Sequence, residues 1–225
     1  MTKIIGDLFY FLVYITDILL IVLYFIFFKH TKTVKPLVVI IIYCVIDLII
    51  NYFVEVFPFR VMFFLYSFFT LAEYILFTTF FWLNIKSKSF RNVVILTAVL
   101  FTIFLLIYYN VTTTQVLDSI PIGIETILIL IYSFYYLYEQ MNDTNNLFIY
   151  TTYPFWIVTG IMIYLAGSFF IYIFANQVDR EILLKYWFLT NVFYVIKNIL
   201  FAIAILIHVK QSKSPHPAKL QPYLN

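Results

Sequence analysis

Seven apolar runs divide the 225-residue chain, and each is long enough to cross a bilayer as a helix. Because lipid offers no hydrogen-bond partners, a run of about 20 apolar residues in a membrane must satisfy its own backbone, and a helix does so. The chain is 64% hydrophobic and 11% charged, whereas a soluble domain carries about 25% charged residues. We therefore predict an all-α, polytopic membrane bundle of seven transmembrane helices. The predicted segments are residues 6–28, 36–56, 60–83, 92–109, 119–138, 150–174 and 183–208.

Polar or proline-bearing breaks separate the runs, and the shortest break matters most for the helix count. Only Phe57, Pro58 and Phe59 separate the second run from the third, and a proline at this place indicates a turn between two helices. We predict one transmembrane domain over residues 1–210, followed by a short cytoplasmic tail over residues 211–225 that is disordered. This tail is too short to fold alone.

The 14 Lys and Arg residues are distributed unevenly between the two ends of the predicted helices. Nine follow the first, third and seventh helices, four lie at the opposite ends, and Lys197 lies within the seventh helix. Because cytoplasmic loops carry the excess of positive charge, we predict an outer N-terminus, a cytoplasmic C-terminus and a multi-pass location in the cell membrane. The scattered cations do not form the basic patch that nucleic-acid binding needs, but they suit contact with the headgroups of the lipid bilayer.

Five ionisable side chains lie deep inside the apolar runs: Asp17, Asp47, Glu73, Glu125 and Lys197. A charged group at the bilayer centre costs roughly 2.5–3.5 kcal/mol on insertion scales, so five imply on the order of 10–15 kcal/mol that pairing, hydration or protonation must offset. A helix does not need such residues to span a membrane. They predict a polar pocket between the helices.

Helical spacing places further polar side chains beside these five. Tyr43, Asp47 and Asn51 follow one another at intervals of four, and the seventh segment groups amide, phenol and amine side chains on one side. Polar groups in membrane helices face the bundle interior. We therefore predict one shared site for a ligand or ion, formed by Asp17, Asp47, Asn51, Glu73, Glu125, Asn191, Tyr194, Lys197 and Asn198.

The depth of these residues predicts that the pocket opens outward. The deepest ones lie near the midplane, whereas Asn51, Glu125 and Asn191 fall in the outer half of their helices. Four deep acids against one lysine would leave three excess negative charges, so we expect one or two protonated acids, or a cation or water in the site. By depth, the predicted partner of Lys197 is Glu73 or Asp47.

Several chemistries are not indicated by the sequence. The three His residues lie at the cytoplasmic edge or in the tail, and the single Cys44 lies in an apolar run, so we predict no metal site and no cofactor. No HExxH or GxSxG motif occurs. The sequence favours a non-catalytic protein, although an Asp/Glu pair can carry out acid–base chemistry.

The last three segments contain a group of motifs that bear a resemblance to known proteins. These motifs are Pro154-Phe-Trp-Ile with Gly160, Tyr164 and Gly167, then Trp187 and the run Lys197-Asn198-Ile-Leu-Phe-Ala. They resemble a group of bacterial seven-helix membrane proteins, which includes stand-alone chains and segments similar to the N-terminal membrane part of sensor histidine kinases. The resemblance implies that the bundle perceives a signal and passes it to a separate cytoplasmic partner, because no kinase follows residue 225. Gly160 and Gly167 also predict close packing of the sixth helix, which is otherwise apolar.

The sequence leaves four functional hypotheses. We favour a non-catalytic, receptor-like or sensory module whose intramembrane pocket takes a small ligand, an ion or a proton. The alternative is a transporter for a small solute or cation, although transporters usually have a helix-breaking residue at mid-span and mid-span Pro is absent here. A lipid-modifying membrane enzyme with a carboxyl pair, and an assembly or scaffold subunit, are weaker alternatives.

Overall fold

A computed structural model of the protein is all-helical over the residues that it describes, which are 2–56, 59–111, 119–143, 148–174 and 177–213. Seven of the described helices are long and apolar enough to cross a membrane, which confirms the predicted fold class and makes the chain a multi-pass membrane protein. They are α1 (Thr2–Ile26), α3 (Lys35–Val56), α4 (Phe59–Asn84), α5 (Lys88–Val111), α6 (Ser119–Met141), α7 (Tyr153–Phe174) and α9 (Phe188–Lys213).

Three short helices connect the long ones: α2 (Phe28–Thr31), η1 (Ile149–Thr151) and α8 (Arg180–Tyr186). The sequence did not predict α8, because the apolar run from residue 183 reads as the start of the seventh span. The helix is interrupted at Trp187, whose carbonyl accepts both the backbone N–H of Thr190 at 3.1 Å and the Thr190 hydroxyl at 2.7 Å. This tight turn replaces the regular helical bond, so α9 begins at Phe188.

Two other boundaries differ from the predicted ones, and for the first the structure shows the reason. Helix α5 begins about one turn early, since the Glu139 carboxylate accepts the backbone N–H groups of Lys86 at 2.7 Å and Ser87 at 2.8 Å beside its N-terminus. Helix α9 continues to Lys213, past the predicted end of the transmembrane domain at 210. The rest of the predicted tail, residues 214–225, lies outside the described residues, as does Pro58.

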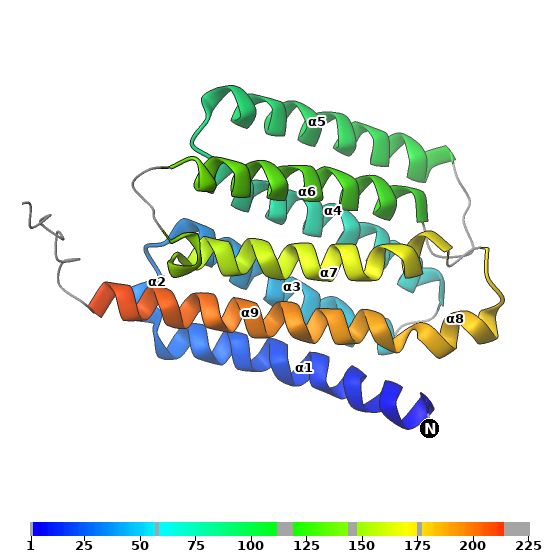
Figure 1. Cartoon of the computed structure of the whole chain (residues 1–225). Coiled ribbons are helices and arrows are strands. Elements are labelled where there is room, and N and C mark those ends of the chain that lie inside the picture. Colours follow the sequence, from blue (N-terminus) through cyan, green and yellow to red (C-terminus); the bar gives the residue numbers. More distant parts are fainter. Residues whose placement is uncertain (1, 57–58, 112–118, 144–147, 175–176, 214–225) are drawn as a thin grey trace, which may run out of the picture.

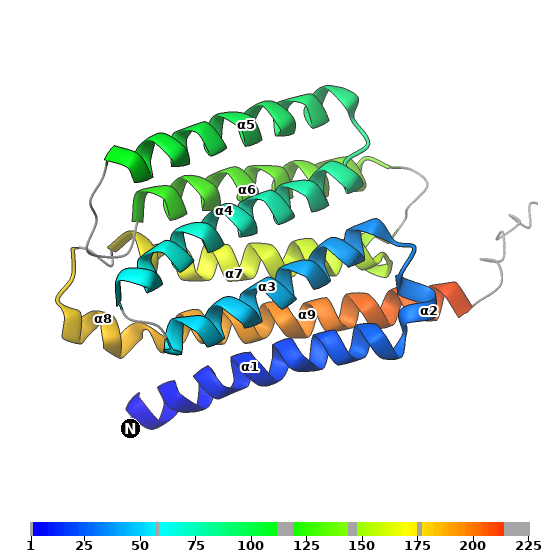
Figure 2. The same cartoon turned by 180° about the vertical axis from the view of Figure 1, so that it is seen from behind.

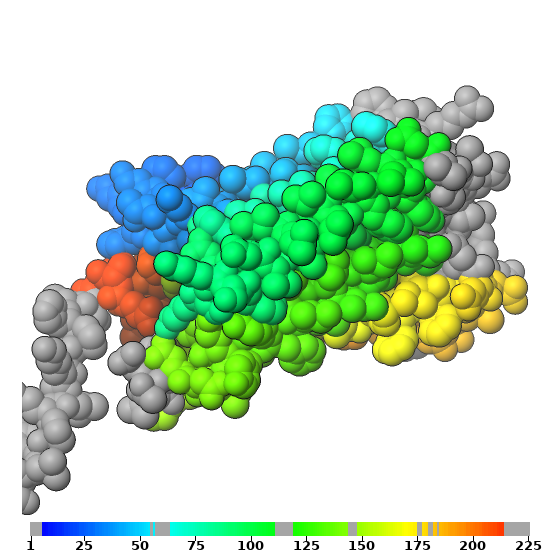
Figure 3. All heavy atoms as spheres, turned by 90° about the horizontal axis from the view of Figure 1, so that it is seen from above, coloured from blue at the N-terminus to red at the C-terminus, as the bar shows by residue number. Residues whose placement is uncertain are grey.

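Six of the long helices form a closed ring around the core. Contacts run from α1 to α3, α4, α6, α7 and α9 in turn, and α9 packs back against α1 (Figures 1 and 2). Helix α5 stands outside this ring, and its main contacts are with α4 and, to a smaller extent, with α6. The space-filling view from above Figure 1 shows α5 running across the surface of the bundle (Figure 3).

The helices alternate in direction, so the basic segments meet at one end of the bundle. Helix α2, the start of α5 and the end of α9 lie at the same end, and they carry Lys29, Lys86, Lys88, Arg91 and Lys210 (Figure 1). The charge asymmetry that the sequence predicts is therefore present in space. That this end faces the cytoplasm remains a prediction.

Helices α7 and α9 pack closely along the ring, as the glycines of α7 predict. A Cβ added at Gly167 would lie 2.5 Å from Cγ of Phe193, and one at Gly160 would lie 3.2 Å from the backbone oxygen of Lys197. At Gly167 a Cβ would force Phe193 to move, and at Gly160 the neighbouring atoms would have to shift by a few tenths of an ångström. Glycine therefore lets α7 approach the part of α9 that carries the predicted site.

Candidate functional site

All five deep ionisable residues are buried in the structure. The exposed fractions are 0% for Asp17 and Lys197, 2% for Glu125, 4% for Asp47 and 6% for Glu73. Charged side chains are almost never fully buried unless they are paired or hydrogen-bonded. Their partners therefore decide what the site can do.

The carboxyl groups of Asp17 and Asp47 meet at one hydroxyl. The Tyr194 hydroxyl of α9 lies 3.2 Å from Asp17 Oδ1 and 3.3 Å from Asp17 Oδ2, and it also makes a short hydrogen bond to Asp47 Oδ2. Asp17 comes from α1 and Asp47 from α3, so three helices converge on this point. A phenol carries one proton and can donate it to only one carboxylate at a time.

Two amide side chains donate further hydrogen bonds to this carboxyl pair. Asn198 Nδ2 donates to Asp17 Oδ1 at 2.9 Å and to Thr16 Oγ1 at 2.9 Å. Asn51 Nδ2 donates to Asp47 Oδ2 at 2.8 Å, one helical turn along α3. These contacts hold both carboxyl groups in place, as hydrogen bonds from surrounding residues do in preorganised sites.

Lys197 is enclosed by aromatic rings rather than by carboxylates. Its Nζ lies 3.5 Å from the ring centroid of Tyr194, 4.3 Å from that of Tyr43 and 4.7 Å from that of Tyr164. Ring faces attract an ammonium group, and the attraction is stronger where water is excluded. We call these three tyrosines the aromatic cage.

The hydrogen bond of Lys197 runs through a tyrosine to an acid. Nζ donates to the Tyr43 hydroxyl at 2.6 Å, and that hydroxyl donates to Glu73 Oε1 at 3.0 Å. No described carboxylate forms a direct ion pair with Lys197. The sequence predicted Glu73 or Asp47 as the partner, and the structure connects Lys197 to Glu73 indirectly.

The structure thus brings seven side chains together, which we call the polar cluster. Its members are Asp17, Tyr43, Asp47, Glu73, Tyr194, Lys197 and Asn198. Hydrogen bonds form one group around Tyr194 and a second group around Tyr43, and the contact of Lys197 Nζ with the Tyr194 ring connects the two groups. Asn51 extends the cluster through Asp47. The cluster joins α1, α3, α4 and α9, so most of the predicted site residues do lie together.

Two predicted site residues stand apart from the polar cluster. Glu125 on α6 is buried, and its Oε1 has no hydrogen-bond partner among the described residues. Asn191 is half-buried on α9, one turn before Tyr194. That these residues line a pocket open to the outside stays a prediction.

Two residues of the aromatic cage, Tyr43 and Tyr164, were not predicted as site residues from the sequence. Tyr43 was placed on the stripe with Asp47 and Asn51, but only its spacing of four from Asp47 pointed to the site. Tyr164 lies in α7, which reads as an apolar packing helix, and no pattern in that helix marks it. Its place in the aromatic cage follows from the close approach of α7 to α9 at Gly160 and Gly167.

Comparison with known proteins adds no functional assignment. No protein-family model, curated protein or solved structure matches the chain. In the described part of the chain, no three His, Cys, Asp or Glu side chains gather as a metal site would require. The function is therefore argued from the chemistry of the polar cluster, and the resemblance to bacterial seven-helix proteins remains a prediction.

Proposed function

We propose that the chain is a non-catalytic, receptor-like sensory protein of the cell membrane, in which the polar cluster takes up positive charge, as a proton or a small monovalent cation. The main observation behind this proposal is that acidic groups outnumber basic groups in the polar cluster. Three carboxyl groups in the cluster face one ammonium group, and none of these four side chains is more than 6% exposed. An uncompensated buried charge is costly, so the site is completed by positive charge from outside.

The geometry at Tyr194 supports the same conclusion independently. Its hydroxyl contacts both Asp17 and Asp47 but has only one proton to donate. One more proton on either carboxyl group, or a cation between them, turns two competing acceptors into a satisfied pair. A shared proton between closely placed carboxyl groups is a common solution to this problem.

Uptake of charge at this place would act on helix packing. The polar cluster connects α1, α3, α4 and α9, and the hydrogen bonds between these helices change when a carboxylate becomes neutral or binds a cation. A ligand shifts a conformational equilibrium only through contacts that differ between the two states. We propose that the altered packing is read by a separate cytoplasmic partner.

The other hypotheses need access that the burial of the cluster does not favour. A lipid substrate would have to reach Asp17 and Asp47, which are 0% and 4% exposed. Transport requires the same groups to open to each face in turn. Uptake of a labelled cation into proteoliposomes would favour the transporter over the sensory module.

Thermal unfolding of the purified protein tests the proposal directly. We expect the melting temperature to change with pH at fixed salt if the charge is a proton, and with Na⁺ or K⁺ at fixed pH if it is a cation. A ligand present at 100 times its Kd stabilises by about 2.7 kcal/mol, which corresponds to roughly 5–10 °C for a chain of this size.

The matched variants are Asp17→Asn with Asp47→Asn, and Asp7→Asn as the control. The double variant removes both carboxyl groups and should flatten the response, whereas Asp7 is exposed on the same helix and its replacement should preserve it. A melting temperature that is insensitive to both pH and cations in the unmodified protein would reject the proposal.

A further inference from the structure

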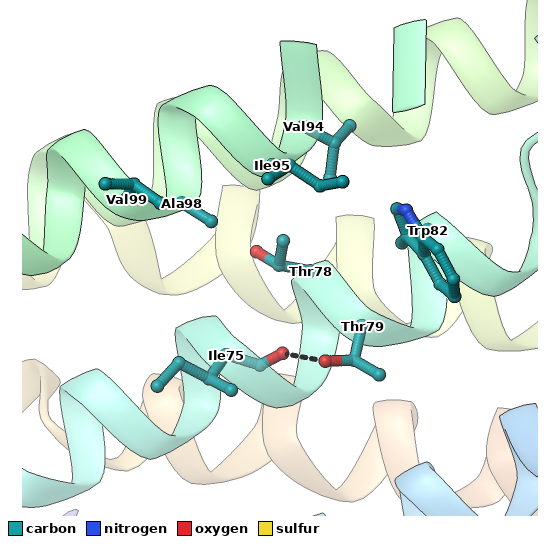
Figure 4. Close-up of a pocket in the computed structure, with 8 residues that line it drawn as sticks. All are labelled: Ile75, Thr78, Thr79, Trp82, Val94, Ile95, Ala98 and Val99. Carbon is teal, nitrogen blue, oxygen red and sulfur yellow. Dashed lines mark hydrogen bonds between the residues drawn. The ribbon is translucent and has the colours of Figure 1, made fainter. Parts of the chain in front are cut away.

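A groove lies between α4 and α5, on the outer side of the ring and away from the polar cluster. Its volume is about 270 Å³. Figure 4 shows its lining residues, which are Ile75, Thr78, Thr79, Trp82, Val94, Ile95, Ala98 and Val99. Trp82 follows Ile75 by seven positions on α4, so the groove runs for about 10 Å along this helix.

Along this stretch, α5 also contacts α6. Thr97 of α5 lies 2.6 Å from the Tyr132 hydroxyl of α6, and the rings of Phe90 and Tyr135 stack at 3.5 Å. Facing α4, the small side chain of Ala98 leaves the space unfilled (Figure 4). The contacts with α6 thus help to fix the position of α5 beside the groove.

Cationic side chains lie at one end of this groove. The Arg91 guanidinium lies 4.1 Å from the ring centroid of Trp82, which lines the groove at that end. Lys86 is paired with Asp143, and Glu139 is bound to backbone N–H groups. Within the described ranges, neither Arg91 nor the exposed Lys88 forms an ion pair with a carboxylate.

We propose that the groove binds one acyl chain of an anionic phospholipid, whose phosphate is bound by Arg91. The apolar walls match a hydrocarbon chain, and the groove opens on the helix surfaces of a membrane protein, where lipid is the surrounding solvent. A guanidinium forms paired hydrogen bonds to phosphate oxygens, and stacking on Trp82 fixes its plane at the groove end. Anionic lipids are attracted by such cations at the membrane surface.

Fluorescence of Trp82 tests this binding. The chain has three Trp residues, so Trp156→Phe with Trp187→Phe leaves Trp82 as the single reporter. The protein is reconstituted in mixed vesicles of phosphatidylglycerol and phosphatidylcholine, with brominated acyl chains on one lipid or the other. We expect brominated phosphatidylglycerol to quench Trp82 more strongly, with an apparent affinity about fivefold higher than that of phosphatidylcholine, the ratio expected for one cation at the surface.

Two variants separate headgroup binding from acyl-chain binding. Arg91→Gln should remove the preference for phosphatidylglycerol, whereas Lys210→Gln, at the same end of the bundle, should retain it. Ala98→Leu fills the groove and should reduce quenching by both lipids. Equal quenching by the two lipids in the unmodified protein, or a preference that survives Arg91→Gln, would overturn the proposal.

Discussion

The hydroxyl oxygen of Tyr43 connects the buried Lys197 to the carboxyl group of Glu73. It accepts a hydrogen bond from Lys197 Nζ at 2.6 Å and donates one to Glu73 Oε1 at 3.0 Å. Both of these groups are buried, and water cannot replace the hydroxyl without entering the core. Loss of this hydroxyl would therefore remove a hydrogen bond from both Lys197 and Glu73.

Tyr43→Phe removes that atom and keeps the ring of the aromatic cage. We expect the free energy of unfolding to fall by about 1–3 kcal/mol, because a buried donor and a buried acceptor lose their partner together. Tyr52→Phe on the same helix is the control, since Tyr52 is exposed and surface changes usually stay within about 0.5 kcal/mol. Unfolding in detergent, followed by circular dichroism, measures both. Equal stability of the two variants would show that the hydrogen bonds through Tyr43 contribute nothing.

At the scale of the elements, the sequence predicted the long helices well and the contacts between their faces only in part. A run of apolar residues in lipid has to form a helix, so the seven spans follow from the lengths of the apolar runs and the breaks between them. The short helix α8 and the contribution of Tyr164 do not follow, since they depend on a carbonyl at Trp187 that bonds locally and on how closely α7 approaches α9. In lipid, apolar periodicity does not distinguish an inward face from an outward one, so a tyrosine in an apolar helix gives no sign of its neighbours.

The close contact between α7 and α9 predicts different outcomes at two glycines. A Cβ at Gly167 would lie 2.5 Å from the Phe193 ring, whereas a Cβ at Gly123 on α6 would lie an ordinary 3.5 Å from Ile173 Cδ1. We expect Gly167→Ala to destabilise by about 1–3 kcal/mol through overpacking. Gly123→Ala should be neutral or stabilising, because alanine favours a helix by about 1 kcal/mol over glycine. Thermal unfolding in detergent compares the two, and a Gly167→Ala protein as stable as Gly123→Ala would contradict close packing at this point.

In the molecule as a whole, the basic segments and the buried ionisable groups occupy different places. Its basic segments share one end of a bundle in which six helices form a ring and α5 lies outside. The polar cluster lies inside the ring, and the α4–α5 groove lies on its outer side with Arg91 at the basic end. The bundle thus separates an internal site for positive charge from an external surface for anionic lipid. Both proposals depend on which end of the bundle faces the cytoplasm, because the anionic leaflet and the signalling partner are expected there.

Cysteine labelling in whole cells tests this orientation. Cys44 is buried and is replaced first by Cys44→Ser, and single cysteines are then introduced as Ser89→Cys and Gln177→Cys, both at exposed positions. Ser89 is the second residue of α5, whose start lies at the basic end, and Gln177 lies between α7 and α8, at the opposite end (Figure 1). Because positive charge is retained on the cytoplasmic side, a membrane-impermeant maleimide should label Gln177→Cys in intact cells and Ser89→Cys only after permeabilisation. The reverse pattern would place Arg91 and the groove end at the outer surface, and the site of the proposed partner with it.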